Sequence, residues 1–309
     1  MPVIAGVVVA AVVVAVVQTR AARTISAARA AGPAAGAPVA GATPPATATP
    51  AATPPGHVEQ LHVASPETDK PVRDVWVYRP SVPDSSTLPV LYFLHGVPGS
   101  GSDLFGAGLA AALDAAIANG MPPMVVVSPD GEGSAHADTE WANSIDGADE
   151  LETFVTVSVR NAVEGDHPRD PAHRAIAGFS MGGYGAMNLA LRHPELYRQV
   201  VSIAGYFEVN DPSGMFGGRT DVIEANTPAD QLPAAGQLHI LLLDGAQDSE
   251  PVVAGASQQM KARLDDAAVP AELVIAPGTH TWSYVASQFP TMLSFIASGW
   301  PVAGPGTSA

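Results

Sequence analysis

The sequence contains no cysteine. This absence excludes disulfide bonds, a thiolate nucleophile, zinc held by thiolates, and lipid attached to an N-terminal cysteine. The sequence also lacks the H-E-x-x-H pattern of zinc hydrolases, and the acidic loop from Asp130 to Asp138 has no spacing suited to metal ligands. We therefore expect neither a metal site nor a cofactor.

Basic residues are scarce, with 14 lysines and arginines against 30 acidic residues and a net charge of -16. Arg20, Arg23 and Arg29 precede the first acidic residue, Glu59, so the negative excess falls on the chain after it. A surface of this sign repels phosphate backbones and anionic lipid headgroups. Nucleic acid is therefore not expected as a partner, and membrane contact is expected only through the N-terminal segment.

That segment begins with an apolar run from Val3 to Val17. The run is shorter than the ~20 residues of a transmembrane helix, and Ala28-Arg29-Ala30 matches the A-x-A pattern of signal cleavage. Residues 1–30 are therefore predicted to be a signal peptide or signal anchor, of a protein secreted or anchored to the membrane and facing the cell exterior. A buried helix is the alternative, because no basic residue precedes the run and arginines follow it.

Two further boundaries follow from composition. Residues 31–56 are almost wholly Ala, Pro, Thr and Gly, which predicts a disordered linker. Residues 57–302 are long enough for one sizeable core and are predicted to form a single catalytic domain, followed by a flexible tail at 303–309.

After Gly56, short β-rich runs alternate with alanine-rich stretches, which is typical of a mostly parallel sheet with helices on both faces. Continuous apolar runs indicate strands buried on both faces. Eight strands are predicted, at Val58–Val63, Val72–Tyr78, Val90–Leu94, Met124–Val127, Arg174–Ala177, Val200–Ile203, His239–Leu243 and Glu272–Ile275. Helices are predicted at Leu109–Asn119, Gly182–His193, Pro251–Ala268 and Trp282–Ala297.

A G-x-S-x-G pattern stands between one of these strands and a helix, with Ser180 at its centre. In a nucleophile elbow the serine occupies a strained turn, and glycines let the strand and helix pack closely around it. Ser180 is therefore the predicted nucleophile of an acyl transfer. The alternative is a glycine-rich turn without catalysis.

Acyl transfer also needs hydrogen-bond donors for the oxyanion of the tetrahedral intermediate. The first predicted donor is the backbone amide of Met181, which follows the nucleophile, and the second is that of Val97, in the loop after the third strand. For His95, in the same loop, a structural role is expected.

The acid and the base follow the nucleophile in the order Ser, Asp or Glu, His. His280 comes directly after the last strand and is the predicted base. The loop after the seventh strand offers Asp244, Asp248 and Glu250, of which Asp248 is preferred because Asp244 is so close to the strand end. Trp282, two residues beyond the base, is a candidate for substrate binding.

Together these segments resemble the esterase D-like α/β-hydrolases, which include S-formylglutathione hydrolases, secreted esterases and mycolyltransferases of actinobacteria. The resemblance covers residues 72–300 and is carried by Leu94-His95-Gly96, Trp141-Ala142-Asn143-Ser144, Glu152-Thr153-Phe154, Gly178 to Gly185, and Gly278-Thr279-His280-Thr281-Trp282. It implies an α/β-hydrolase fold and an acyl-enzyme mechanism, with Ser180, Asp248 and His280 at the triad positions and Val97 and Met181 at the oxyanion positions.

One departure concerns the loop that mycolyltransferases use near the sugar, Asp-Gly-Leu-Arg. This chain has His95-Gly96-Val97-Pro98 there, without the acid and the arginine. The leading hypothesis is therefore an exported carboxylesterase acting on a small-molecule or lipid ester. The alternatives are an acyltransferase that uses a sugar or glycerol hydroxyl, and an inactive cell-wall-binding module. The insertion from Asn210 to Leu232 is expected to be a mobile lid.

Overall fold

The computed structural model describes residues 54–209, 211 and 213–301. The predicted signal segment, residues 31–53 of the predicted linker, residue 302 and the predicted tail lie outside the described residues. Within the described ranges, no helix combines the length and the apolar character that a membrane crossing requires.

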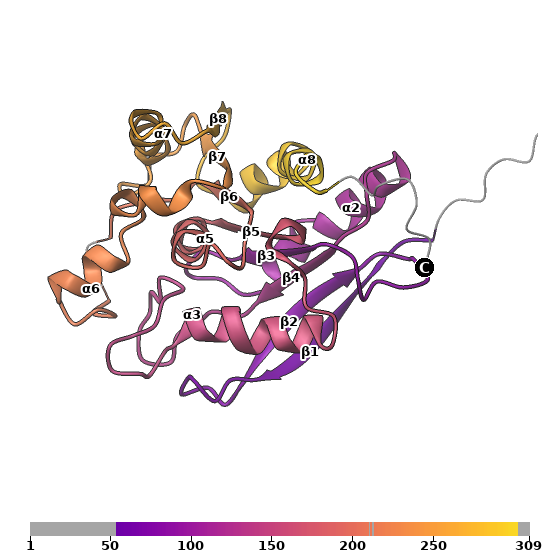
Figure 1. Cartoon of the computed structure of the whole chain (residues 1–309), viewed down its shortest axis with the longest axis horizontal. Coiled ribbons are helices and arrows are strands. Elements are labelled where there is room, and N and C mark those ends of the chain that lie inside the picture. The colour runs from indigo at the N-terminus through magenta and orange to yellow at the C-terminus, as the bar shows by residue number, and fades with distance from the viewer. Residues whose placement is uncertain (1–53, 210, 212, 302–309) are drawn as a thin grey trace, which may run out of the picture. The chain divides into compact units, whose positions relative to one another are not determined.

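The fold is built on an eight-stranded sheet with the order β1-β2-β4-β3-β5-β6-β7-β8 (Figure 1). The strands are β1 (His57–Ala64), β2 (Val72–Arg79), β3 (Val90–Leu94), β4 (Val125–Pro129), β5 (Arg174–Phe179), β6 (Gln199–Ile203), β7 (His239–Gly245) and β8 (Ala271–Ala276). The β1–β2 and β2–β4 pairs are antiparallel and the remaining pairs are parallel. The predicted mostly parallel sheet is confirmed.

Burial along the strands explains this arrangement. Every residue of β3, β4, β5 and β6 is buried, as expected for strands with helices on both faces. The edge strand β1 has one buried residue, Val63, among its eight. Its alternation of apolar and polar residues matches a strand with one face toward solvent.

Helices pack on both faces of the sheet. Helices α2 (Leu109–Ala118) and α8 (Trp282–Ser298) contribute to one apolar core. The other core receives η1 (Phe154–Val159), α4 (Arg160–Glu164), α5 (Met181–Arg192) and α7 (Ala256–Asp266). In Figure 1, α2 and α8 lie together on one side of the strands and α5 lies across the sheet from them.

Several helices differ from the prediction. No element is predicted at residues 151–164, where α3 (Leu151–Thr153), η1 and α4 form one helical stretch. The β-branched residues of that stretch have low helix propensity, but packing buries four residues of η1. Helix α7 begins at Ala256 instead of Pro251, because the preceding turns end at Gly255 with φ 82°. The short helices α1 (Asp103–Gly106) and α6 (Thr220–Ala225) are also unpredicted.

The segment predicted as a lid is partly folded. Helix α6 and η3 (Pro228–Asp230) lie within it, and η4 (Leu232–Ala235) begins at its last residue. Asn226 accepts a hydrogen bond from the Asn188 side-chain amide at 3.0 Å, which ties the segment to α5. Met215 and Phe216 are fully buried. The mobility of this segment stays a prediction.

Candidate active site

The turn between β5 and α5 holds Ser180 in a strained conformation. Its φ of 58° and ψ of -122° lie outside the usual regions for a residue with a side chain. Its amide donates to the carbonyl oxygen of Ile203 at 2.9 Å, which fixes the turn against β6. A Cβ on Gly182 would lie 2.0 Å from the carbonyl oxygen of Leu94, so glycine is required there. This geometry is that of a nucleophile elbow.

His280 lies between Ser180 and Asp248, although the three come from distant parts of the chain. Its Nε2 is 2.8 Å from the Ser180 Oγ, and its Nδ1 is 2.8 Å from the Asp248 Oδ2. When the carboxylate accepts the Nδ1 hydrogen, Nε2 carries a lone pair toward the serine hydroxyl. The imidazole is also packed against the ring of Phe179, with ring centroids 4.8 Å apart. The arrangement can transfer a proton from the serine to the histidine.

Of the three acids left open by the sequence, Asp248 contacts the imidazole. Asp244 is 2% exposed and accepts a hydrogen bond from the Gly245 amide at 2.9 Å. Burial raises the pKa of Asp244 to about 6, and the nearby carboxylate of Asp248 adds to this shift. Glu250 is exposed and lies at the wall of the cavity next to Ser180.

The loop after β3 lies directly against the elbow. A Cβ on Gly96 would be 2.9 Å from the Cβ of Ser180, and Val97 lines the same cavity as Ser180. The amide of Met181 is at the first position of α5, where a backbone N–H has no acceptor within the helix. The two amides predicted to bind an oxyanion therefore belong to segments on either side of the serine.

His95 holds this loop in place. It is 1% exposed, its Nδ1 lies 2.7 Å from the carbonyl oxygen of Gly96, and its Nε2 accepts from the Gly131 amide at 2.9 Å. The indole N–H of Trp141 donates to the His95 carbonyl oxygen at 3.0 Å. These bonds confirm the structural role predicted for His95.

The predicted binding residue Trp282 lies elsewhere. Its ring packs against Phe179 and Phe93, with centroids 5.3 and 6.2 Å away. It is not among the described residues that line the cavity beside Ser180. Its part in substrate binding stays a prediction, whereas its packing against Phe179, which also contacts the His280 ring, is observed.

The cavity beside Ser180 has a volume of about 260 Å³. This is smaller than the roughly 300 to 1,000 Å³ of typical ligand pockets, so it encloses only the part of a substrate close to the reacting bond. The described residues that line it are Val97, Asp138, Glu140, Ser180, Met181, Tyr206, Glu208, Glu250, Val252 and His280.

Glu140 is a candidate functional residue that the sequence analysis missed. Its side chain is 1% exposed, and its carboxylate accepts a short hydrogen bond from the Tyr206 hydroxyl. Burial, together with the charge of the neighbouring Asp138 carboxylate, raises the pKa of Glu140 to about 8. The sequence signals this residue only through the acidic loop from Asp130 to Asp138, which lies just before it. Among the described residues, no group of three or more possible ligand side chains could hold a metal ion.

The loop that carries Glu140 is anchored by a second carboxylate, Asp149. Asp149 is fully buried and accepts hydrogen bonds from the amides of Ser134, Ala135 and His136 at 2.9 to 3.0 Å. Burial opposes its charge, but these hydrogen bonds outweigh burial and lower the pKa of Asp149 to about 2. The loop therefore has a fixed conformation that brings Glu140 to the cavity.

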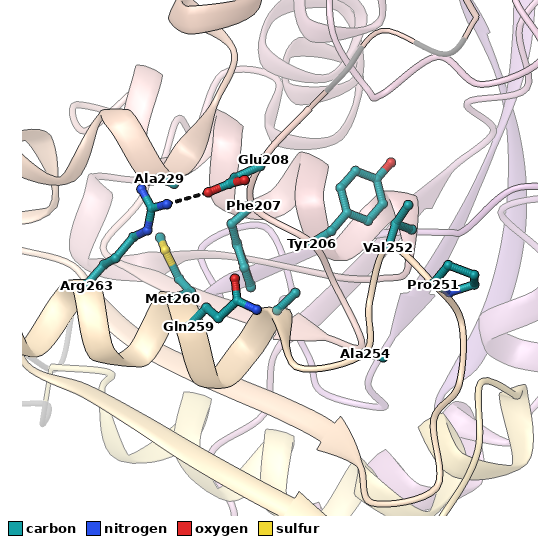
Figure 2. Close-up of a pocket in the computed structure, with 11 residues that line it drawn as sticks. Tyr206, Phe207, Glu208, Ala229, Pro251, Val252, Ala254, Gln259, Met260 and Arg263 are labelled. Carbon is teal, nitrogen blue, oxygen red and sulfur yellow. Dashed lines mark hydrogen bonds and ion pairs between the residues drawn. The ribbon is translucent and has the colours of Figure 1, made fainter.

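A second cavity, of about 200 Å³, adjoins the first (Figure 2). The two cavities share the lining residues Tyr206, Glu208 and Val252. Figure 2 shows Glu208 paired with Arg263, which comes from α7. A substrate longer than the first cavity can therefore extend toward the second one past these side chains.

The elbow at the end of a central parallel strand, with a histidine after the last strand, defines the class of the α/β-hydrolases. The chain belongs to the esterase family described as "Putative esterase", whose profile matches residues 65–296.

Known proteins agree with this assignment. The chain is 24% identical over 229 residues to Esterase Rv1288 of Mycobacterium tuberculosis, a match that covers 63% of this chain and 49% of that protein. It is 28% identical over 145 residues to S-formylglutathione hydrolase of Rattus norvegicus, covering 41% of this chain and 50% of the relative. The matched region thus spans about half the length of these relatives.

Among solved structures, one described as a ferulic acid esterase matches with a TM-score of 0.68 and 23% identity. The match covers 80% of this chain and 99% of that one. At this level of identity, the likeness supports the fold and not the substrate.

Proposed function

We propose that the protein is an exported serine carboxylesterase in which Ser180, His280 and Asp248 form the catalytic triad. The observation that carries the proposal is the continuous hydrogen-bonded chain from the Ser180 Oγ through the imidazole to the Asp248 carboxylate, with 2.8 Å at each step. Membership of the esterase family supports the same reaction class.

In the first half-reaction, the Ser180 Oγ attacks the ester carbonyl carbon while His280 Nε2 takes its proton. The backbone amides of Val97 and Met181 donate hydrogen bonds to the resulting oxyanion. When the tetrahedral intermediate collapses, the bond to the alcohol breaks, and His280 returns the proton to the departing alkoxide oxygen. The acyl group is left on Ser180 Oγ.

In the second half-reaction, water attacks the acyl-enzyme, and His280 takes one of its protons. Collapse of the second intermediate releases the carboxylic acid, and the proton returns to Ser180 Oγ. Asp248 keeps the imidazole in the tautomer that both steps need.

An acyltransferase is the second candidate, in which a sugar or glycerol hydroxyl replaces the water. The segment Gly278 to Trp282 favours it through its resemblance to the corresponding segment of mycolyltransferases. Incubation with a p-nitrophenyl ester in the presence of trehalose or glycerol separates the two: ester products on the added alcohol support transfer, and release of free acid alone supports hydrolysis.

Export rests on the apolar run at residues 3–17 and the A-x-A triplet after it. Expression of the full chain with a C-terminal tag tests this part of the proposal. Recovery of the protein in the medium or on the outer surface of the membrane supports export, and retention in the cytoplasm contradicts it.

The catalytic assignment is tested by covalent labelling with a fluorophosphonate and by ester hydrolysis. The wild-type protein should be labelled, and Ser180→Ala should abolish both labelling and turnover while the melting temperature stays close to that of the wild type. Ser298→Ala is the matched control, because its hydroxyl is exposed at the end of α8. A folded wild-type protein without labelling would support an inactive binding module instead.

A further inference from the structure

The cavity beside Ser180 has an unusual balance of charge. Four carboxylates line it, and the described lining residues include no lysine or arginine. Glu208 is paired with Arg263, and Glu250 is open to solvent. Asp138 and Glu140 remain, and within the described part of the chain neither forms an ion pair with a cationic side chain.

Glu140 is held rigidly at this position. Its backbone has a φ of 50°, and its amide donates to the Asp138 Oδ1 at 3.2 Å. The Tyr206 hydroxyl donates to its Oε2, and Tyr206 itself stacks on Tyr184 with ring centroids 5.1 Å apart. No hydrogen bond to the other oxygen, Oε1, is found among the described residues. A 99% buried carboxyl group therefore lines the cavity with one oxygen free for a ligand.

A buried carboxylate without a cationic partner is unfavourable, because its charge has lost its hydration and one hydrogen bond does not replace it. The protein can relieve this by binding a proton, which agrees with the raised pKa of Glu140. A cationic ligand relieves it as well, and it also gains the attraction of Asp138 and of the aromatic ring of Tyr206. A hard metal ion is a poor fit. Ca²⁺ takes roughly six to eight oxygen ligands, whereas no three possible ligand side chains among the described residues lie close enough together to hold one ion.

We infer that the cavity receives an ammonium group of the ester substrate, bound by Glu140 together with Asp138 and Tyr206. This inference rests on the proposed serine esterase function, since Ser180 and Glu140 line one small cavity. The ammonium group therefore lies within a few atoms of the reacting ester bond. Esters with an anionic group at the same place are repelled.

The test compares esters that differ in charge and not in shape. The first pair is the p-nitrophenyl esters of trimethylammoniobutanoic acid and of its neutral isostere, in which a tert-butyl group replaces the trimethylammonium group. The second pair is acetylcholine and the matching tert-butyl analogue, which carry the same difference on the alcohol side. The pair whose cationic and neutral members differ in kcat/KM shows whether the acyl side or the alcohol side of the ester enters the cavity.

For the favoured pair, the wild-type enzyme near pH 8 should prefer the cationic ester by about tenfold or more in kcat/KM, as expected for a desolvated cation held by a carboxylate and an aromatic ring. Glu140→Gln keeps the size of the side chain and should lower kcat/KM for the cationic ester by a larger factor than kcat/KM for the neutral ester, so that the ratio of the two falls toward one. Glu132→Gln is the matched control, because Glu132 belongs to the same loop and its side chain is 70% exposed. This control should keep the full preference.

A second measurement does not depend on the folding of a variant. Tetramethylammonium should inhibit hydrolysis of the neutral ester competitively in the wild-type enzyme, and tert-butanol at the same concentration should not. Equal rates for both members of both pairs, with no inhibition by tetramethylammonium, overturn the inference and leave the esterase function intact. A cationic preference that survives in folded Glu140→Gln overturns the assignment to Glu140. Failure of fluorophosphonate labelling and of hydrolysis of every ester refutes the proposed function itself.

Discussion

The choice between Asp244, near the end of β7, and Asp248, in the loop that follows, can be tested by replacing each with asparagine. In Asp248→Asn, the side-chain oxygen is expected to stay where Oδ1 now accepts the Glu250 amide at 3.0 Å. The new amide group then takes the place of Oδ2 and donates to His280 Nδ1. The imidazole must place its hydrogen on Nε2, facing Ser180, and in this tautomer it cannot accept the serine proton.

The size of the effect follows from this change of tautomer. The corresponding loss in a Ser-His-Asp triad is about ten-thousandfold in turnover, which is about 5 kcal/mol of transition-state stabilisation. Asp244→Asn is the matched control, because Asp244 bonds the Gly245 amide and no hydrogen bond joins it to His280 among the described contacts. Its kcat/KM should stay within about tenfold of the wild type, or about 1.4 kcal/mol.

The assay is kcat/KM for p-nitrophenyl acetate, with melting temperatures to establish that both variants are folded. The rate of fluorophosphonate labelling should fall in parallel for Asp248→Asn, since it depends on the same activated serine. The reasoning is refuted if folded Asp248→Asn retains activity within tenfold of the wild type, or if Asp244→Asn is the slower of the two.

Two further predictions concern stability. Gly182→Ala should lower the melting temperature strongly, because the added Cβ would lie 2.0 Å from the Leu94 carbonyl oxygen. Gly106→Ala is the control and should leave the melting temperature nearly unchanged, because its added Cβ would have no atom of another described segment within 4 Å. Because the pKa of Asp149 falls from 3.8 to about 2 on folding, its charge contributes about 2 kcal/mol. That contribution is complete above pH 3.8 and is lost as the pH falls toward 2. In urea unfolding followed across this range, Asp149→Asn should be less stable at neutral pH and less sensitive to acid; an unchanged profile would contradict the anchoring role.

The strand pattern and the elbow could be predicted from sequence because both depend on local signals. Glycines around Ser180 mark a turn that only small residues permit, and β-branched runs mark buried strands. The position of His280 after the last strand follows from chain order. The choice of Asp248 over Asp244 depends on how a short loop turns away from β7, which no local pattern determines.

Other features depend on contacts between distant segments. Glu140 reaches the cavity because Asp149 binds the backbone of its loop and Tyr206 receives its side chain from beyond β6. The helical stretch at residues 151–164 has a β-branched composition that disfavours a helix, and packing against the sheet overrides this propensity. Neither outcome could be read from neighbouring residues alone.

Asp149 holds its loop through the main-chain amides of Ser134, Ala135 and His136, and also through the side chains of Ser134 and His136. Residues 137–140 make none of these hydrogen bonds. The loop can accept substitutions at its tip and still return to the same place beside Ser180. If Glu140 selects the substrate as inferred above, the selectivity of the protein can change without a change in the proposed triad. Exchange of residues 137–140 is therefore a direct way to change which substrates the proposed nucleophile accepts.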